Sequence, residues 1–126
     1  MSTLKSISPL LLVVDLDRSI AFYTQELGFN IDFRYEDFYA GVIINGYTIH
    51  LKCGKPTKQE RENRKANEDL DLIFSVEGIR ELYDVMITKS VNIIQPLREM
   101  PYGQEFYISD PDEYLIAFIG WIHGPI

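Results

Sequence analysis

The feature that most constrains the fold is an internal repeat, in which the second half of the chain restates the pattern of the first. At an offset of 62 residues, the correspondences pair Asp15 with Glu77, Arg18 with Arg80, Ile20 with Leu82 and Asn30-Ile31 with Asn92-Ile93. Near the ends of the two copies, Tyr47, Ile49 and Leu51 match Tyr114, Ile116 and Phe118 at an offset of 67. A period of this length indicates one supersecondary unit used twice. We therefore expect two small related units within the 126 residues.

Each copy predicts a strand, a helix and three further strands. Residues 10–14 form an apolar run of strand length, which either Asp15 or Asp17 can follow as the cap of a helix that ends before Gly28. Asn45-Gly46 predicts a two-residue hairpin turn, because both residues tolerate positive φ angles. The second copy repeats the order, with strands at 70–76, 91–97, 106–109 and 114–119 and a helix at 78–89. We predict an α+β fold of two tandem βαβββ modules, residues 6–53 and 69–122, in a single domain.

Residues 54–68 interrupt the repeat, because they contain no large apolar side chain. Six of the twelve Lys and Arg residues of the chain lie between positions 52 and 65. Such a composition predicts a charged, solvated connector, and it leaves open whether the segment is a plain linker or a basic flap over an acidic cleft.

Charge and cysteine content limit the partners and the compartment. The net charge of −7 argues against binding to nucleic acid or to anionic membranes, which demand an excess of positive surface. An acidic body suits a cationic ligand, although acidity for solubility alone is the simpler reading. One cysteine cannot form a disulfide within the chain, and no apolar run approaches the length of a membrane span. We expect a cytoplasmic protein.

Three stretches carry a resemblance to a known family. They are Val14-Asp15-Leu16-Asp17-Arg18-Ser19-Ile20-Ala21-Phe22-Tyr23, Glu26-Leu27-Gly28-Phe29 and Ser109-Asp110-Pro111-Asp112. In this order and spacing the chain resembles the vicinal oxygen chelate superfamily, which contains glyoxalases, extradiol dioxygenases and bleomycin-resistance proteins. The resemblance implies paired βαβββ modules, each with a sheet curled around a pocket, and a homodimer partner that completes the pocket.

The same resemblance provides a test for a metal. Members that use a divalent ion place His and Glu ligands on the first and last strands of each module, and the corresponding positions here are Ser8, His50, Asp71 and Ala117. A metal centre requires at least three good protein donors. Only His50 and Asp71 could serve, so the resemblance implies no cofactor and no catalytic residue. A divergent lyase or dioxygenase with one divalent metal ion at His50 and Asp71 stays as the alternative, and whether the protein is an enzyme is left open.

The bleomycin-resistance branch is similar in further short stretches, which imply a binding site. The chain carries Ser8-Pro9 before the first strand, Asp32-Phe33, Glu36-Asp37-Phe38, and Pro101-Tyr102-Gly103-Gln104-Glu105-Phe106, with Tyr102 where the family usually has Trp. The resemblance implies that Pro9 belongs to an arm exchanged between the protomers of a dimer. It also implies the ligand-binding residues, with aromatic faces from Phe33, Phe38 and Tyr102, the adjoining Gly103, and carboxylates from Asp32, Glu36, Asp37 and Glu105.

Stacking faces and an acidic field suit a cation with flat rings. The expected function is metal-independent sequestration of a cationic, partly aromatic antibiotic of the bleomycin type, or of a similar small molecule, in a cleft at the dimer interface. The one tryptophan, Trp121, is expected to serve in packing or in a dimer contact.

Overall fold

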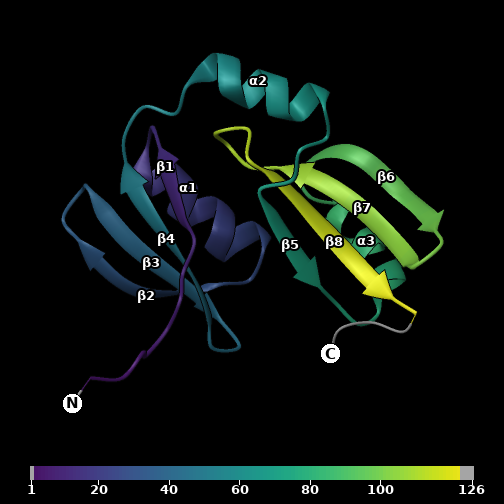
Figure 1. The fold of residues 1–126 in the computed structure, drawn as a ribbon, viewed down its shortest axis with the longest axis horizontal. Helices are drawn as coiled ribbons and strands as arrows, with labels where there is room; N and C mark the ends of the chain where they lie inside the picture. The colour runs from purple at the N-terminus through teal and green to yellow at the C-terminus, as the bar shows by residue number, and fades with distance from the viewer. Residues whose placement is uncertain (1, 123–126) are drawn as a thin grey trace. The chain divides into compact units, whose positions relative to one another are not determined.

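The computed structural model describes residues 2–122 and confirms the α+β fold with two βαβββ-like units. The chain divides into Met1–Pro56 and Thr57–Ile126. Each unit has a four-stranded mixed sheet, and each sheet carries a helix on one face (Figure 1). Within residues 2–122 none of the helices combines the length and the apolar character that crossing a bilayer requires.

The first unit has the strand order β1-β4-β3-β2. Its elements are β1 (Leu10–Val13), α1 (Leu16–Ala21) with a π-helical turn over Phe22–Glu26, β2 (Asn30–Tyr35), β3 (Tyr39–Ile44) and β4 (Tyr47–Cys53). Strand β1 runs parallel to β4, and the other pairs are antiparallel. The backbone N–H of Arg18 donates to the Asp15 carboxylate at 3.1 Å, which identifies Asp15 as the helix cap. Positive φ angles of 51° at Asn45 and 83° at Gly46 confirm the predicted hairpin turn.

The second unit repeats this topology with the order β5-β8-β7-β6. Its elements are α2 (Lys58–Ala66), β5 (Leu72–Ser75), α3 (Ile79–Met86), β6 (Asn92–Met100), β7 (Gly103–Ser109) and β8 (Leu115–Trp121). Strand β5 is parallel to β8, as β1 is to β4. The first strands of the two units, Leu10–Val13 and Leu72–Ser75, are displaced by the same 62 residues as the sequence repeat.

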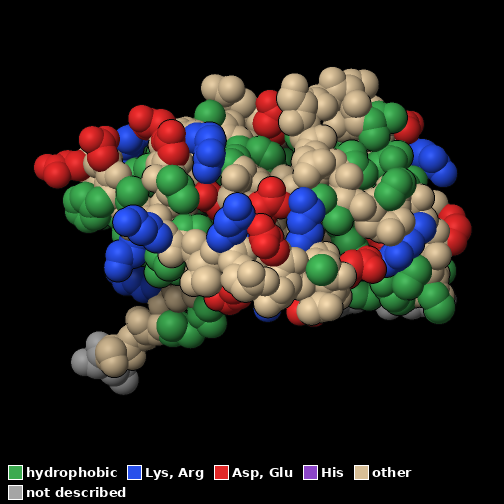
Figure 2. Space-filling model, turned by 90° about the horizontal axis from the view of Figure 1, so that it is seen from above, with side chains coloured by type: hydrophobic (Ala, Val, Ile, Leu, Met, Phe, Trp, Pro, Cys, Tyr) green, Lys and Arg blue, Asp and Glu red, His purple; other side chains and the backbone are tan. Residues whose placement is uncertain are grey.

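Helix α2 occupies the segment in which the sequence predicted only a charged connector. Its inward side chain is Arg61, which is 8% exposed and donates to the Asp71 carboxylate at 2.9 Å. A packed helix is usually recognised in a sequence by a stripe of apolar residues. In α2 the buried position is an arginine, so the sequence shows no such stripe and the helix was not predicted. Figure 2, which views the molecule from the α2 side, shows Lys and Arg side chains interleaved with Asp and Glu.

Buried apolar side chains lie mainly on the helix-covered face of each sheet, although Tyr107, Ala117 and Ile119 on the other face of the second sheet are also buried. The faces covered by α1 and α3 hold the apolar core, with the members Val13, Val42, Leu51, Phe106, Ile108 and Ile116 all at 0% exposure. Successive residues of a strand point to opposite faces, so the alternate positions form a second surface on each sheet. We call these surfaces the first and the second helix-free face. The first contains Leu10, Leu12, Phe33, Tyr39 and His50, and the second contains Ser75, Arg98, Glu105, Tyr107 and Trp121.

Candidate functional site

The first helix-free face carries an aromatic cluster centred on Phe33. The Phe33 ring stacks on Tyr39 with centroids 5.9 Å apart, and it meets the His50 ring edge-on at 5.1 Å. The Tyr39 hydroxyl and His50 Nδ1 are hydrogen-bonded at 2.8 Å. Gly41 makes room for this arrangement, since a Cβ atom there would lie 2.3 Å from the Phe33 ring. Phe33 therefore lies on the sheet surface opposite α1, half-buried among other rings.

Four other predicted ligand-binding residues surround the turn from β2 to β3. Phe38 is 53% exposed within the turn, and Asp32 is exposed at a bulge of β2, between the paired residues Ile31 and Phe33. Arg34 organises the turn by donating to the Glu36 carbonyl at 2.7 Å and to the Asp37 carboxylate at 3.1 Å. The turn thus presents the exposed Phe38 ring beside several carboxylates.

Arg34 also connects this turn to the first helix. Its Nη1 atom lies 2.8 Å from the Asp17 carboxylate, and the hydrogen bond to Asp17 is the main cause of the raised pKa of Arg34. The positive charge of Arg34 is shared between Asp17 and Asp37, so these two carboxylates are partly neutralised. The Asp32 and Glu36 side chains, both exposed, contribute the remaining negative charge of the turn.

The second helix-free face holds a buried carboxylate, Glu105, which is 1% exposed. Arg98 donates to Oε2 from Nε at 2.9 Å and from Nη2 at 2.6 Å, and the Tyr107 hydroxyl donates to the same oxygen at 2.8 Å. The Tyr102 hydroxyl donates to Oε1. We call these four side chains the Glu105 network. Both carboxylate oxygens are occupied, so Glu105 does not face solvent as the predicted cation-attracting group would.

Hydrogen bonding controls the protonation of this network. Burial by itself raises the pKa of Glu105, but the hydrogen bonds from Tyr102, Arg98 and Tyr107 outweigh burial and hold that pKa below its usual value. The hydrogen bond to Glu105 in turn raises the pKa of Tyr102 to about 12. Burial raises the pKa of Tyr107 as well. At neutral pH the network therefore contains an ionised carboxylate, a guanidinium and two protonated phenols.

Trp121 contacts Tyr102 of the Glu105 network, whereas the sequence predicted packing or a dimer contact for this residue. Its ring lies 5.3 Å from the Tyr102 ring at an angle of 41°, and its Nε1–H donates to the Ser75 hydroxyl at 2.9 Å. Tyr102 itself is 36% exposed. Tyr102 and Trp121 are nineteen positions apart in the sequence. Their contact follows from the register of the β7–β8 hairpin, which pairs Gly103 with Trp121, and this register could not be read from the sequence.

Gly103 has a structural role beside Tyr102. Its φ angle is 148°, and a Cβ atom at this position would lie 2.0 Å from the carbonyl oxygen of Gly120. Only glycine allows β7 and β8 to approach this closely where β7 begins. The glycine thus fixes the hairpin end on which the Tyr102 and Trp121 rings meet.

The residues at the family's metal positions do not offer a set of donors that fits a divalent ion. His50 Nδ1 is hydrogen-bonded to Tyr39, the Ser8 hydroxyl is hydrogen-bonded to Thr48, and Ala117 has no donor. Within residues 2–122 no group of three His, Cys, Asp or Glu side chains is arranged to hold a metal ion.

Asp71 is engaged in holding α2. Its Oδ2 atom accepts from Arg61 at 2.9 Å and from the Leu115 backbone N–H at 2.8 Å, while Oδ1 accepts from Arg64 at 3.0 Å. A carboxylate with these three donors is an anchor for the helix, because a metal ion would have to displace both arginines.

The predicted arm residue Pro9 is exposed and lies immediately before β1. Its carbonyl accepts the backbone N–H of His50 at 2.9 Å, which extends the β1–β4 ladder by one bond. Upstream, Leu4 and Ile7 are 80% and 81% exposed. An extended segment with two exposed aliphatic side chains precedes the first sheet.

Comparison of the sequence with known proteins identifies the family of the chain. The model of the Glyoxalase/Bleomycin resistance protein/Dioxygenase superfamily matches residues 5–118. A bleomycin resistance protein of Geobacillus stearothermophilus is 31% identical over 127 aligned residues, which cover 87% of this chain and 92% of that protein.

Solved structures share the fold at lower identity. The bleomycin-binding protein of bleomycin-producing Streptomyces verticillus, in complex with copper(II)-bleomycin, is 20% identical with a TM-score of 0.70, covering 95% of this chain and 98% of that one. TnmS3, an antibiotic binding protein from Streptomyces sp. CB03234, is 17% identical with a TM-score of 0.70, covering 95% of this chain and 99% of that one.

Proposed function

The chain belongs to the glyoxalase/bleomycin resistance protein/dioxygenase superfamily, and from this premise we propose that it is a metal-independent protein that sequesters a cationic, partly aromatic antibiotic or a similar small molecule. The observation that carries the proposal is the 31% identity to a bleomycin resistance protein over 87% of the chain. The donor set at the family's metal positions, with Asp71 held by two arginines, supports binding over metal-assisted chemistry.

The described side chains suit such a ligand. Phe38 and Tyr102 present exposed ring surface, on which flat heteroaromatic groups stack. The carboxylates of Asp32 and Glu36 lie near Phe38 in the chain, and the net charge of −7 attracts a cation over a longer range. Sequestration requires neither a nucleophile nor a general base, since the ligand is held and not modified.

The proposal includes a homodimer whose interface closes the binding cleft, with Pro9 in an exchanged arm. Exposed aliphatic side chains support a second copy as the partner, because Leu4 and Ile7 on the arm and Leu10 on β1 are all about half exposed or more, at 80%, 81% and 49%. Large apolar side chains left exposed on one segment of the chain support an interaction site there. The proposed place of action is the cytoplasm, where a single cysteine stays reduced.

Calorimetric titration with metal-free bleomycin and with copper(II)-bleomycin tests the proposal. We expect saturable binding of at least one form, weakened about tenfold in Phe38→Ala because a stacking surface is lost. Tyr47→Ala is the matched control, since Tyr47 is a 76% exposed ring in the other hairpin of the same unit. Absence of binding at about 100 μM drug, which means a binding free energy weaker than about 5.5 kcal/mol, would refute bleomycin as the ligand.

A further inference from the structure

An apolar side chain that belongs to no strand lies on the second helix-free face. The side chains of Tyr107, Ala117 and Ile119 form a buried apolar cluster there, which we call the Tyr107 patch. Leu70, in the segment that joins α2 to β5, packs against this patch. A side chain on a strand is held in place by the ladder hydrogen bonds, whereas Leu70 depends on the contacts of its own segment. Part of this face is therefore covered by a connecting segment of the same unit.

The turn that places Leu70 also brings a charge to the face. Glu68 has a φ angle of 54°, in the left-handed region, which turns the chain sharply after α2. The backbone N–H of Asp69 donates to the Arg64 carbonyl oxygen at 2.8 Å and closes the turn. The Glu68 carboxylate lies 3.8 Å from Nη2 of Arg98. Residues 68–70 thus contribute a carboxylate and an apolar side chain to a sheet of which they are not a part.

Two basic residues of α2 hold this segment in place. Arg64 donates from Nη2 to the Leu70 carbonyl oxygen at 2.9 Å and from Nε to the Asp71 carboxylate at 3.0 Å. Lys65 is paired with Glu113 at 3.0 Å, and both of these side chains are partly exposed. Because Arg64 binds the Leu70 backbone directly, the position of Leu70 on the Tyr107 patch is coupled to the position of α2.

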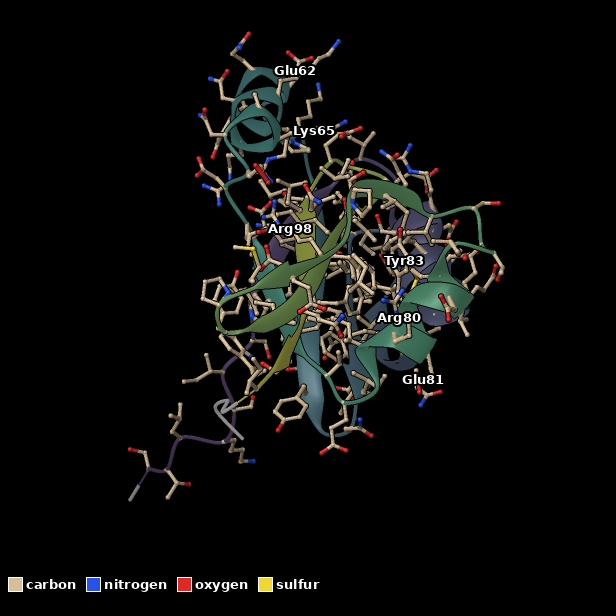
Figure 3. All side chains as sticks on the ribbon, turned by 90° about the vertical axis from the view of Figure 1, so that its right-hand side faces the viewer. Glu62, Lys65, Arg80, Glu81, Tyr83 and Arg98 are labelled. Atoms are coloured by element: carbon tan, nitrogen blue, oxygen red, sulfur yellow. The ribbon has the colours of Figure 1, made fainter. Side chains whose placement is uncertain are left out.

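Helix α2 differs from α1 and α3 in the way it is packed. Both of those helices bury apolar side chains, whereas α2 contains no Leu, Ile, Val, Phe or Met. The side chain that α2 buries is Arg61, whose guanidinium lies 4.3 Å from the centre of the Tyr114 ring. In Figure 3, Lys65 lies on the side of α2 nearer to the sheet, and Glu62 lies on the side away from it. Charged contacts, which salt weakens, therefore replace the apolar burial that usually holds a helix.

We propose that residues 58–70 form an autoinhibitory strap, which keeps Leu70 on the Tyr107 patch and opens as a unit to admit an apolar group of a small-molecule ligand in its place. All of these residues lie outside the strands, so opening breaks the contacts of Arg64 and Lys65 and leaves the ladders of β5, β6, β7 and β8 intact. The inference goes beyond the proposed function, because it concerns access to one sheet and holds for any ligand with an apolar group.

Amide hydrogen exchange of the natural chain gives the first test. The amides of the strap should exchange with one common opening rate, faster than those of β7 and β8, because the strap opens while the sheet stays closed. Raising KCl from about 0.1 M to about 1 M shortens the screening distance from about 10 Å to about 3 Å, and it should accelerate exchange of the strap at least about threefold. Exchange in β7 is the internal control and should stay the same.

Arg64→Gln loosens the strap without leaving a buried charge alone, because Asp71 keeps its hydrogen bonds from Arg61 and from the Leu115 backbone. We expect the strap to exchange about tenfold faster, since two hydrogen bonds from a charged donor are lost. Arg80→Gln is the matched control. It removes the same charge from an exposed side chain of α3 that forms no ion pair within residues 2–122, and it should exchange as the natural chain does.

The neutral dye Nile red reports whether the Tyr107 patch becomes accessible. Trp121 packs against this patch and is the one tryptophan of the chain, so its indole signal in a ¹H–¹⁵N spectrum locates the dye. Because apparent affinity scales with the open fraction, Arg64→Gln should bind the dye about tenfold more tightly than the natural chain, the same factor as for exchange. Leu70→Ala empties the patch and keeps the charged contacts of α2. It should bind the dye more tightly as well, while its strap exchanges more slowly than in Arg64→Gln.

Three results would contradict the strap. They are exchange of α2 no faster than that of β7 in the natural chain, equal exchange in Arg64→Gln and Arg80→Gln, and dye binding by Leu70→Ala no tighter than by the natural chain. Loss of protection in β7 would show that Arg64→Gln has unfolded, and the salt dependence of the natural chain together with Leu70→Ala then decides. None of these results depends on whether bleomycin binds, so the strap and the proposed function can fail separately.

Discussion

Among the single residues, Glu105 illustrates how a buried charge is kept ionised. An unpaired carboxylate at 1% exposure would lose several kcal/mol of hydration, and the cost is met by four hydrogen bonds from three side chains. Since each donor also depends on the carboxylate for its orientation, the Glu105 network fixes the position of Tyr102 at the start of β7. The orientation of the partly exposed Tyr102 side chain is thereby set by a buried carboxylate.

The pKa of Tyr102 provides the first prediction. In an absorbance titration at alkaline pH, one tyrosine should ionise near pH 12, and Tyr102→Phe should remove this step. In Glu105→Gln the step should move toward the ordinary value of 10.0, because the carboxylate that opposes ionisation is gone. A titration in which all tyrosines of Glu105→Gln and of the natural chain ionise together would contradict the hydrogen bond between Tyr102 and Glu105.

The same network predicts the dependence of stability on pH. The folded-state pKa of Glu105 lies below its unfolded value of 4.5, so its stabilising contribution is complete above that pH and is lost as the pH falls through the folded pKa. For Tyr102 the folded pKa is the higher one, so its contribution is complete below pH 10 and is lost as the pH rises toward about 12. Urea unfolding across both ranges should show a smaller decline at each end for Glu105→Gln than for the natural chain.

Gly103 allows a matched comparison of backbone strain. Gly103→Ala should lower the free energy of unfolding by about 3 kcal/mol, because the new Cβ atom meets the Gly120 carbonyl oxygen at 2.0 Å. Gly28→Ala is the control, with a φ angle of 80° and no atom within 4 Å of the added carbon, and it should cost only about 1 kcal/mol. Equal costs in urea unfolding would show that the close approach of β7 and β8 relaxes easily.

At the scale of elements, the sequence predicted those parts that local chemistry specifies. The Asp15 cap and the Asn45-Gly46 turn depend on residues within a few positions of one another, and the repeat revealed the order of the strands. The Glu105 network was not predictable, because Arg98 and Glu105 become partners through a β6–β7 register that shifts twice along β6. Irregularities of this kind leave no period in the sequence.

Helix α2 was missed for a different physical reason, and it yields a prediction. Asp71→Asn should lower the free energy of unfolding by about 3 kcal/mol, because the Arg61 side chain, only 10% exposed, loses its 2.9 Å ion pair and keeps only the 3.7 Å pair with Glu60. Amide hydrogen exchange over residues 58–66 should accelerate more than exchange in β7. Glu62→Gln, which weakens only the exposed 3.9 Å pair with Lys58, should change stability by no more than about 0.5 kcal/mol. Unaltered exchange of α2 in Asp71→Asn would mean that Asp71 does not anchor the helix.

At the scale of the whole molecule, the exposed N-terminal arm predicts association of two chains. Sedimentation equilibrium should give about twice the chain mass of 14.6 kDa at micromolar concentration. Ile7→Glu should shift the equilibrium toward the monomer by about tenfold, because it places a charge in the apolar contact. Ile87→Glu is the control, an isoleucine 53% exposed at the end of α3. A monomer at every concentration, or equal effects of the two substitutions, would exclude the arm as a dimer contact.

The strand pairing has a consequence for how such a chain changes over generations. All of the described strand ladders join strands of the same unit, β1 to β4 in one and β5 to β8 in the other. A substitution on one helix-free face therefore leaves the backbone hydrogen bonds of the other sheet untouched. The two sheets share one strand order and carry different side chains, a cluster of rings around Phe33 in one and an ionic network around Glu105 in the other. A repeated unit of this kind allows the side chains of one sheet to change while the strand ladder of the other stays as it is.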